Sequence, residues 1–210
     1  MGQIKSFIAL SLDGFIASVD GELDWIPQSV RAIPKSLFEN ASCLLVGANT
    51  YDYLFEHLDG QVYKTKPIYV VSHSDYNILP NSNISFLTEK PLDAIRRLKQ
   101  HHEILVIGSG KLLTELIQLE LLDEITICHI PVFVGKGIGF IGETFGSYWQ
   151  LVKCQSNKGT IFATYNSKGS IRLSPSGVRL YSTLGGISGY NLRFTNISAS
   201  NFFNAVVNIF

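Results

Sequence analysis

Residues 104–117 read ILVIGSGKLLTELI, and they indicate the class of fold. The first four residues form an uninterrupted apolar run, which is typical of a strand buried on both faces. From residue 111 onward, apolar residues recur at helical spacing. Gly108, Ser109 and Gly110 lie between the two patterns. We therefore predict a buried strand that passes through a glycine turn into a helix.

A second stretch has the same design. Residues 42–47 form an apolar run that ends at Gly47. Asn49 and Thr50 then offer N-caps for a short helix, and Asp52 suits its first turn. The chain thus contains two predicted units of strand, glycine and helix.

The remaining pattern alternates strands with helices. Further strands are expected at residues 5–12, 15–17, 66–72, 84–87 and 124–134, further helices at 29–39 and 91–102, and a final hairpin of residues 149–156 and 160–165. This alternation predicts an α/β fold with a central, mostly parallel mixed sheet. Helices should cover both faces of the sheet, and an antiparallel hairpin should complete it at the C-terminal end.

Composition limits the classes of function. The chain has 210 residues, 46% hydrophobic and 16% charged, which suits a packed domain with one appendage. It has no polybasic tract, so we expect no nucleic-acid partner. The first 12 residues resemble neither a signal peptide nor a membrane span, so we expect a cytoplasmic protein that does not bind membranes.

The cysteines and histidines do not suggest a metal centre. Cys43, Cys128 and Cys154 lie far apart in apolar runs without a CxxC pair, as small core residues do. His129 lies in an apolar strand pattern, and we interpret it as a hydrogen-bonded core residue. We therefore expect neither a metal site nor a disulfide.

Charge divides the chain near residue 167. Residues 167–210 carry four basic side chains and no acidic one, which leaves 13 basic against 17 acidic residues in the preceding part. Alternating apolar and polar residues in this tail suit short strands. Two interpretations stay open: a β-rich element used for self-association, or an extension without a selected fold.

The two glycine turns are candidate phosphate sites. Ligands of open α/β sheets bind beyond the carboxyl ends of the strands, where helix N-termini present free N–H groups. Glycine lets the backbone approach a phosphate, and Lys111 adds a positive charge. The alternative is that both turns are purely structural. The candidate cofactor-binding residues of the turns are Gly47, Ala48, Asn49, Thr50, Gly108, Ser109, Gly110, Lys111 and Leu112.

Six motifs occur in an order that resembles a known family. They are residues 8–17 (IALSLDGFIA), 21–25 (GELDW), 45–51 (LVGANTY), 68–72 (IYVVS), 106–111 (VIGSGK) and 122–124 (LDE). Together they resemble the dihydrofolate-reductase-like superfamily. The similarity is greatest to the RibD C-terminal branch, the reductase domain of the bifunctional riboflavin-biosynthesis enzyme. We therefore expect a reductase domain of this three-layer fold over residues 4–166, and an extension of unknown structure over 167–210.

The resemblance implies a cofactor, a substrate class and further site residues. It implies NADPH, with NADH as an alternative, and hydride transfer to a pterin-like or ribosylaminopyrimidine substrate. The backbone of Ala9 and Ile16 would hold the nicotinamide carboxamide, and Ser72 and His73 would lie near the adenosine ribose. The substrate pocket would lie beside Leu10 and the two candidate catalytic residues, Asp13 and Trp25.

The chain departs from the family pattern at three positions. Ala48 stands where the family commonly has an arginine for the 2′-phosphate of NADPH, so His73, Lys111 or Lys64 would have to substitute for it. Val30 stands at the helix position of the carboxylate found in true dihydrofolate reductases. Ser109 replaces the second residue of the family's double glycine. These departures point to a divergent reductase.

Three hypotheses for the function follow. The first is an NAD(P)H-dependent oxidoreductase that takes its proton from water or from Asp13, although Asp13-Gly14 is also a common turn pair. The second is a non-catalytic, nucleotide-binding homodimeric domain. The third is an α/β domain without a cofactor. For the enzyme we expect a homodimer.

Overall fold

A computed structural model of the chain describes residues 2–31, 33–57, 65–72, 83–141, 146–174 and 177–179. The chain divides into two compact units, Met1–Ser170 and Ile171–Phe210. In the second unit, residues 172–174 pair in antiparallel fashion with strand β11 (Gly177–Arg179). The first unit contains all the predicted site residues.

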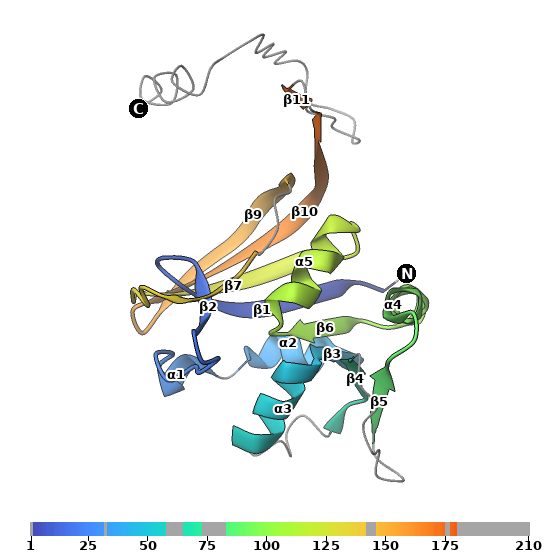
Figure 1. Cartoon of the computed structure of the whole chain (residues 1–210), viewed down its shortest axis with the longest axis horizontal. Coiled ribbons are helices and arrows are strands. Elements are labelled where there is room, and N and C mark those ends of the chain that lie inside the picture. The colour runs from blue at the N-terminus through green and yellow to red at the C-terminus, as the bar shows by residue number, and fades with distance from the viewer. Residues whose placement is uncertain are drawn as a thin grey trace. The chain divides into compact units, whose positions relative to one another are not determined.

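A sheet of eight strands forms the centre of the first unit (Figure 1). Its order is β9-β10-β7-β1-β6-β3-β4-β5. The strands are β1 (Ile4–Ser11), β3 (Cys43–Gly47), β4 (Ile68–Val71), β5 (Ile84–Leu87), β6 (Ile104–Ile107), β7 (Glu124–Ile130), β9 (Gly146–Asn157) and β10 (Thr160–Ser174). The pairs from β7 through β5 are parallel, whereas β10 runs antiparallel to β7.

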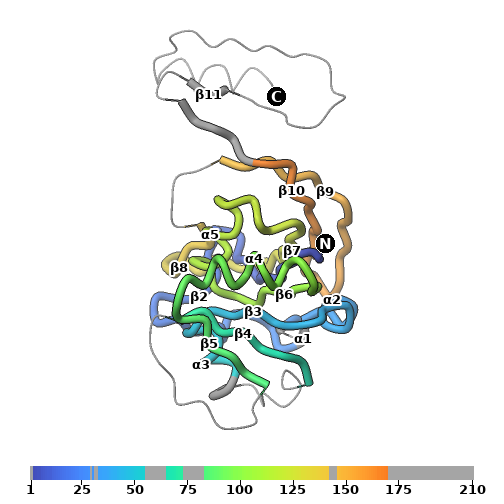
Figure 2. The backbone as a smooth tube through the Cα atoms, turned by 90° about the vertical axis from the view of Figure 1, so that its right-hand side faces the viewer, coloured from blue at the N-terminus to red at the C-terminus, as the bar shows by residue number. Residues whose placement is uncertain are grey.

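Helices cover both faces of this sheet, as Figure 2 shows for α4 and α5 on one side of β3 and β4 and α3 on the other. The helices are α1 (Gln28–Arg31), α2 (Lys35–Asn40), α3 (Ala48–His57), α4 (Pro91–His101) and α5 (Gly110–Gln118). Within the described part of the chain, no helix has both the length and the apolar character needed to cross a membrane.

Alternate residues of the central strands belong to different cores. In β3, Cys43 and Leu45 pack with Leu113 and Leu116 of α5, whereas Leu44 packs on the opposite face, in the cluster that includes Leu54 of α3. Both faces are therefore apolar, which explains the uninterrupted apolar runs of β3 and β6. The predicted α/β fold, with a mostly parallel sheet between two helical layers, is confirmed.

A small two-stranded ribbon accompanies the main sheet. Strand β2 (Phe15–Ser18) pairs in antiparallel fashion with β8 (Gly137–Gly139), with an irregular register near Phe15 and Ala17. The sequence predicted a turn at residues 135–137 rather than β8. A run of glycine and isoleucine carries no strand alternation, so the pairing depends on β2 as a partner.

Two prolines shorten predicted elements. The helix expected over residues 29–39 is instead α1 and α2, with Pro34 as the N-cap of α2 at a non-helical ψ of 126°. The strand expected over 124–134 ends at Ile130, directly before Pro131. Proline removes a backbone donor and restricts the residue before it, and both predictions neglected this effect.

Candidate cofactor and substrate site

The carboxyl ends of the central parallel strands lie at one edge of the sheet. Strand β3 runs directly into α3 at Ala48, and β6 reaches α5 through Gly108 and Ser109. The two strands are neighbours, with Val46 opposite Ile107. The N-termini of α3 and α5 therefore lie side by side and present their free N–H groups at the same edge.

The two glycine turns pack directly against each other. A Cβ atom on Gly47 would lie 2.5 Å from Oγ of Ser109. A Cβ atom on Gly108 would lie 2.8 Å from Cγ2 of Thr50, and Gly108 also has a φ of +61°. Each turn thus uses a glycine where it meets a side chain of the other. The close approach fixes the spacing between the two helix N-termini.

Ser109 begins α5 in an unusual conformation. Its φ of 60° lies in the left-handed region, and its Oγ accepts a hydrogen bond from the backbone N–H of Leu112 at 3.4 Å. The side chain thus satisfies one of the free donors of the helix. In α3 the helix begins at Ala48, so Asn49 and Thr50 lie in its first turn instead of capping it.

Strand β1 has an incomplete edge beside these turns. Its pairing with β6 ends at Phe7 and Ile107, whereas its pairing with β7 continues to Ser11. No partner strand follows along the β6 side of β1 beyond Phe7 in the described residues. Backbone groups of the segment that contains Ala9 are therefore available to a planar polar ligand.

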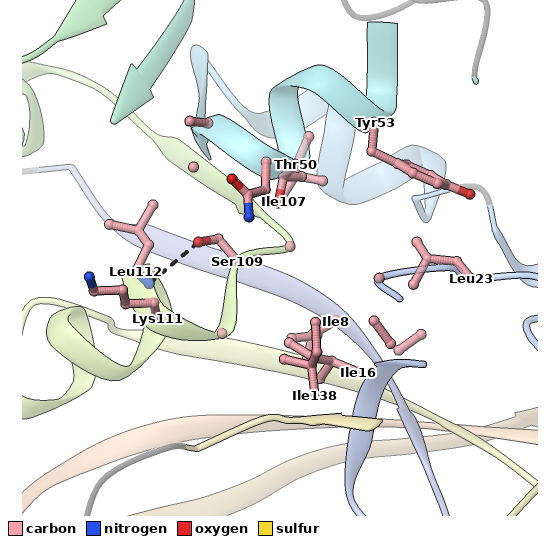
Figure 3. Close-up of a pocket in the computed structure, with 18 of the residues that line it drawn as sticks. Ile8, Ile16, Leu23, Thr50, Tyr53, Ile107, Ser109, Lys111, Leu112 and Ile138 are labelled. Carbon is pink, nitrogen blue, oxygen red and sulfur yellow. Dashed lines mark hydrogen bonds between the residues drawn. The ribbon is translucent and has the colours of Figure 1, made fainter. Parts of the chain in front are cut away.

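A cavity of about 610 Å³ lies over these elements (Figure 3). Twelve of the thirteen predicted cofactor-binding residues line it: Ala9, Ile16, Gly47, Ala48, Asn49, Thr50, Ser72, Gly108, Ser109, Gly110, Lys111 and Leu112. They come from β1, β2, the two turns and the end of β4. The structure brings them together, although their roles stay predictions. His73, the thirteenth, and Lys64 lie outside the described residues.

Asp13 does not line the cavity, and its carboxylate is engaged elsewhere. It accepts hydrogen bonds from the Ser11 hydroxyl at 2.6 Å and from the backbone N–H groups of Val134 and Gly135 at 3.1 and 2.7 Å. The Ser11 hydrogen bond is the main cause that lowers the pKa of Asp13, the two backbone donors lower it further, and partial desolvation opposes them. The carboxylate holds the loop that leads into β8.

Trp25 also lies beside the cavity rather than in its lining. It packs against the cluster of Phe7, Ile26 and Val30, all three of which line the cavity. Its indole Nε1 is buried without a hydrogen-bond partner among the described residues. Its catalytic role stays a prediction. Trp25 packs against side chains that line the cavity and supports them from outside the lining.

Sequence reasoning missed much of the lining. The additional residues include Phe7, Leu23, Ile26, Ile33, Tyr53, Val71, Pro91, Glu115 and Ile138. Helical spacing could have found two of them, since Tyr53 follows Asn49 by four residues and Glu115 follows Lys111 by four. The others come from segments that only the tertiary fold brings to the strand ends.

The lining is polar at one end and apolar at the other. In Figure 3, Ser109, Lys111 and Leu112 lie on one side, and Leu23 and Tyr53 lie on the opposite side. Lys111 and Glu115 are the charged side chains among the described lining residues, and both belong to α5. This division of the lining suits a long ligand that carries an anionic group near α5.

The fold and the paired helix N-termini define a dihydrofolate-reductase-like α/β protein. Dihydrofolate reductase from Enterococcus faecalis, in complex with NADP(H), superposes with a TM-score of 0.57 at 15% identity, covering 79% of this chain and 96% of that one. This likeness concerns the fold. The family model of the RibD C-terminal domain matches residues 3–161, and the chain belongs to this family.

Two further proteins resemble the chain more closely in sequence. A putative riboflavin biosynthesis protein from Shewanella sp. PV-4 has a TM-score of 0.69 at 26% identity, and the match covers 79% of this chain and 99% of that one. The uncharacterized protein YwjB of Bacillus subtilis (strain 168) is 28% identical over 142 residues, which is 65% of this chain and 81% of YwjB. These similarities agree with the membership of the chain in the RibD C-terminal domain family.

Proposed function

We propose that the protein is an NAD(P)H-dependent reductase that transfers hydride to a small heterocyclic substrate. The observation that carries the proposal is the pair of interlocked glycine turns, which open two helix N-termini into one cavity. A single phosphate needs only one such terminus, whereas two adjacent ones suit a pyrophosphate.

The residues present fit a nicotinamide dinucleotide. Gly47 and Gly108 let the two turns pack against each other, which sets the N-termini of α3 and α5 side by side, and Lys111 supplies a positive charge at the start of α5. The incomplete edge of β1 offers backbone groups at Ala9 to a carboxamide, and Ser72 lies at the end of β4 for the adenosine part. When bound, the reduced nicotinamide supplies the hydride.

The protein itself contributes orientation. Ile8, Ile16 and Ile138 line the middle of the cavity, where they present an apolar surface to a flat ring. Glu115 is the one carboxylate among the described lining residues, and it lies on α5 at the phosphate end. We therefore assign the proton to water rather than to Asp13, whose carboxylate holds a loop. Catalysis then rests mainly on positioning.

We expect the protein to prefer NADPH and also to accept NADH. Lys111 is the cation of the described lining and favours the more negative dinucleotide, but Ala48 offers no bidentate contact to a 2′-phosphate. Fluorescence titration with NADPH and NADH measures both affinities. Absence of binding by both dinucleotides would overturn the proposal.

Turnover separates a reductase from a non-catalytic binding domain. Oxidation of NAD(P)H is followed at 340 nm against a panel of dihydropterins, ribosylaminopyrimidines and simple heteroaromatic imines. We expect oxidation with at least one neutral member of the panel. Tight coenzyme binding without any turnover would favour the homodimeric binding domain instead.

Lys111 provides a variant test of the phosphate end. Lys111→Ala should weaken NADPH binding by roughly tenfold, about 1.4 kcal/mol, because it removes the positive charge beside the helix N-terminus. Lys153→Ala is the matched control, since Lys153 is exposed on β9 and does not line the cavity. Equal losses in both variants would argue against a phosphate at α5.

We also propose a homodimer. The β9–β10 hairpin exposes Tyr148, Leu151, Val152 and Ile161, each between 45% and 52% accessible. Large contiguous groups of exposed apolar side chains are a feature of association surfaces. A second copy of the chain is the partner that this proposal requires.

A further inference from the structure

The end of the cavity away from the phosphate turns has a distinct chemistry. Its walls come from β1, the loop after β2, α1 and the segment that follows α1. The apolar side chains there are Phe7, Leu23, Ile26, Val30 and Ile33. Phe7, Ile26 and Val30 are 6%, 5% and 3% exposed, so they form a fixed floor. We call this set the apolar end.

No charged side chain of the described lining belongs to the apolar end. Lys111 and Glu115 both belong to α5, and Figure 3 shows Lys111 on the opposite side of the cavity from Leu23. Tyr53 of α3 also lines the cavity, and in Figure 3 it lies on the same side as Leu23. One hydroxyl can hydrogen-bond a neutral ring, but it cannot neutralise a phosphate or a carboxylate.

This wall is integral to the protein core. Phe7, Ile26 and Val30 pack with Cys128 and Ile130 of β7 in one cluster. Side chains in such a cluster keep their rotamers and cannot withdraw to admit a hydrated anion. A charged substituent placed there would lose its hydration without gaining an oppositely charged partner among the described lining residues.

We infer that the apolar end binds a neutral, flat and largely apolar heteroaromatic substrate that bears no phosphate or carboxylate. The inference rests on the proposed function in one respect, since the proposed function assigns the polar end of the cavity to the coenzyme. It narrows the substrate class by disfavouring phosphoribosyl compounds and folates with a glutamate tail. Unphosphorylated rings with a reducible C=N bond fit the site.

A matched pair of probes tests this inference. Binding of 2-methylquinoxaline and of quinoxaline-2-carboxylate is measured by isothermal titration calorimetry, with saturating NADP⁺ and without it. The two rings have the same size, and only the carboxylate is charged at pH 7.5. We expect the neutral ring to bind at least tenfold more tightly. Equal or tighter binding of the carboxylate, or no binding of the neutral ring, would overturn the inference.

A variant reverses the expected preference. Leu23→Lys adds a cation at the partly buried edge of the apolar end, so the carboxylate should gain at least fivefold in affinity and the neutral ring should lose affinity. Leu23→Met is the size-matched control and should preserve the wild-type preference. Near-ultraviolet circular dichroism reports folding. An unchanged preference in a folded Leu23→Lys protein would count against the assignment of this end.

The outcomes of these experiments distinguish the proposed reductase from the inference about its substrate. Failure of NADPH and NADH to bind would refute the reductase, while the probe pair without coenzyme still tests the apolar end. Coenzyme binding together with a preference for the charged probe would leave the reductase in place and refute the inference about its substrate.

Discussion

The Asp13 carboxylate holds a loop, and the strand that follows this loop contributes to the cavity lining. Its acceptor bonds from Val134 and Gly135 fix the chain just before β8. Strand β8 pairs with β2, and Ile16 and Ile138 of this ribbon line the cavity. We therefore regard Asp13 as a positioning residue. The Asp-Gly pair alone indicated a turn but not its distant partners.

Asp13→Asn should loosen this loop and reveal a pH dependence. The pKa of Asp13 is lowered in the folded protein, so its contribution to stability is present above the ordinary value of 3.8 and is lost as the pH falls through the lower folded value. At pH 6 we expect amide exchange of residues 131–137 to rise on the order of tenfold in the variant. Wild-type protein should show this increase only below about pH 4.

Exchange mass spectrometry, corrected for intrinsic rates, measures this effect. Asp20→Asn in the neighbouring turn is the control and should leave residues 131–137 unchanged. Equal protection of the loop in Asp13→Asn and wild type would show that the carboxylate does not hold it. A further consequence is weaker NADPH binding, by a few-fold, through the displaced ribbon.

Two cysteines are inert because they are buried. Burial raises the pKa of Cys43 and of Cys128 to about 11 in each case. At pH 7.5 less than about 0.1% of each thiol is ionised, and only the thiolate reacts rapidly. In a Cys154→Ser background we expect no reaction of native protein with a disulfide reagent, and two thiols after unfolding. Reaction of either thiol in the native state would contradict their place in the core.

At the element scale, one ion pair joins α4 to the start of the sheet. Nζ of Lys99 lies 2.7 Å from the Asp123 carboxylate and donates to the carbonyl of Leu121 at 2.8 Å. The same carboxylate accepts from the backbone N–H of Ile4 at 2.8 Å. Lys99 is only 7% exposed, whereas the Asp123 side chain is 34% exposed, so the contact is shielded from water mainly on the lysine side. It ties α4, β1 and the approach to β7 together.

Lys99→Met should therefore lower the free energy of unfolding by about 1–3 kcal/mol, because the hydrogen bonds to a charged group are lost. Urea denaturation measures the change. Arg96→Met is the matched control on the same helix, since the Arg96–Asp93 pair is exposed and contributes about 0.5 kcal/mol or less. A similar cost for both variants would show that the Lys99 pair gains nothing from its burial.

The elements themselves were largely predictable from local pattern. The strand–glycine–helix units at Gly47 and Gly108 follow from apolar runs that give way to helical spacing. The break at Pro34 was also available from the sequence, since proline at that position interrupts the helical hydrogen bonds. Strand β8 was not, because Gly137 and Gly139 acquire strand geometry only by pairing with β2.

At the scale of the whole molecule, the β9–β10 hairpin tests the proposed homodimer. Leu151→Lys should shift the protein from about twice the chain mass of 23.3 kDa to the monomer, as measured by light scattering on a sizing column. The added charge cannot be buried in an apolar interface without a large desolvation cost. Val19→Lys, which also replaces an exposed apolar residue, is the control and should leave the mass unchanged.

The sequence by itself determined the α/β class, the family resemblance and the two glycine turns, because these depend on local periodicity and on residue order. It also indicated that a helix begins near Ser109 and Lys111, at a candidate phosphate-binding site. Apolar spacing and turn preference each concern only a few neighbouring residues, so a local sequence pattern carries information over that range.

Only the tertiary structure decided what these turns meet. It set Gly47 against Ser109 and Gly108 against Thr50, directed the Asp13 carboxylate to the 131–137 loop, and lined one end of the cavity with Phe7, Ile26 and Val30. These contacts join residues far apart in the chain. They depend on how packed layers bring strand ends together, and no local pattern carries that information.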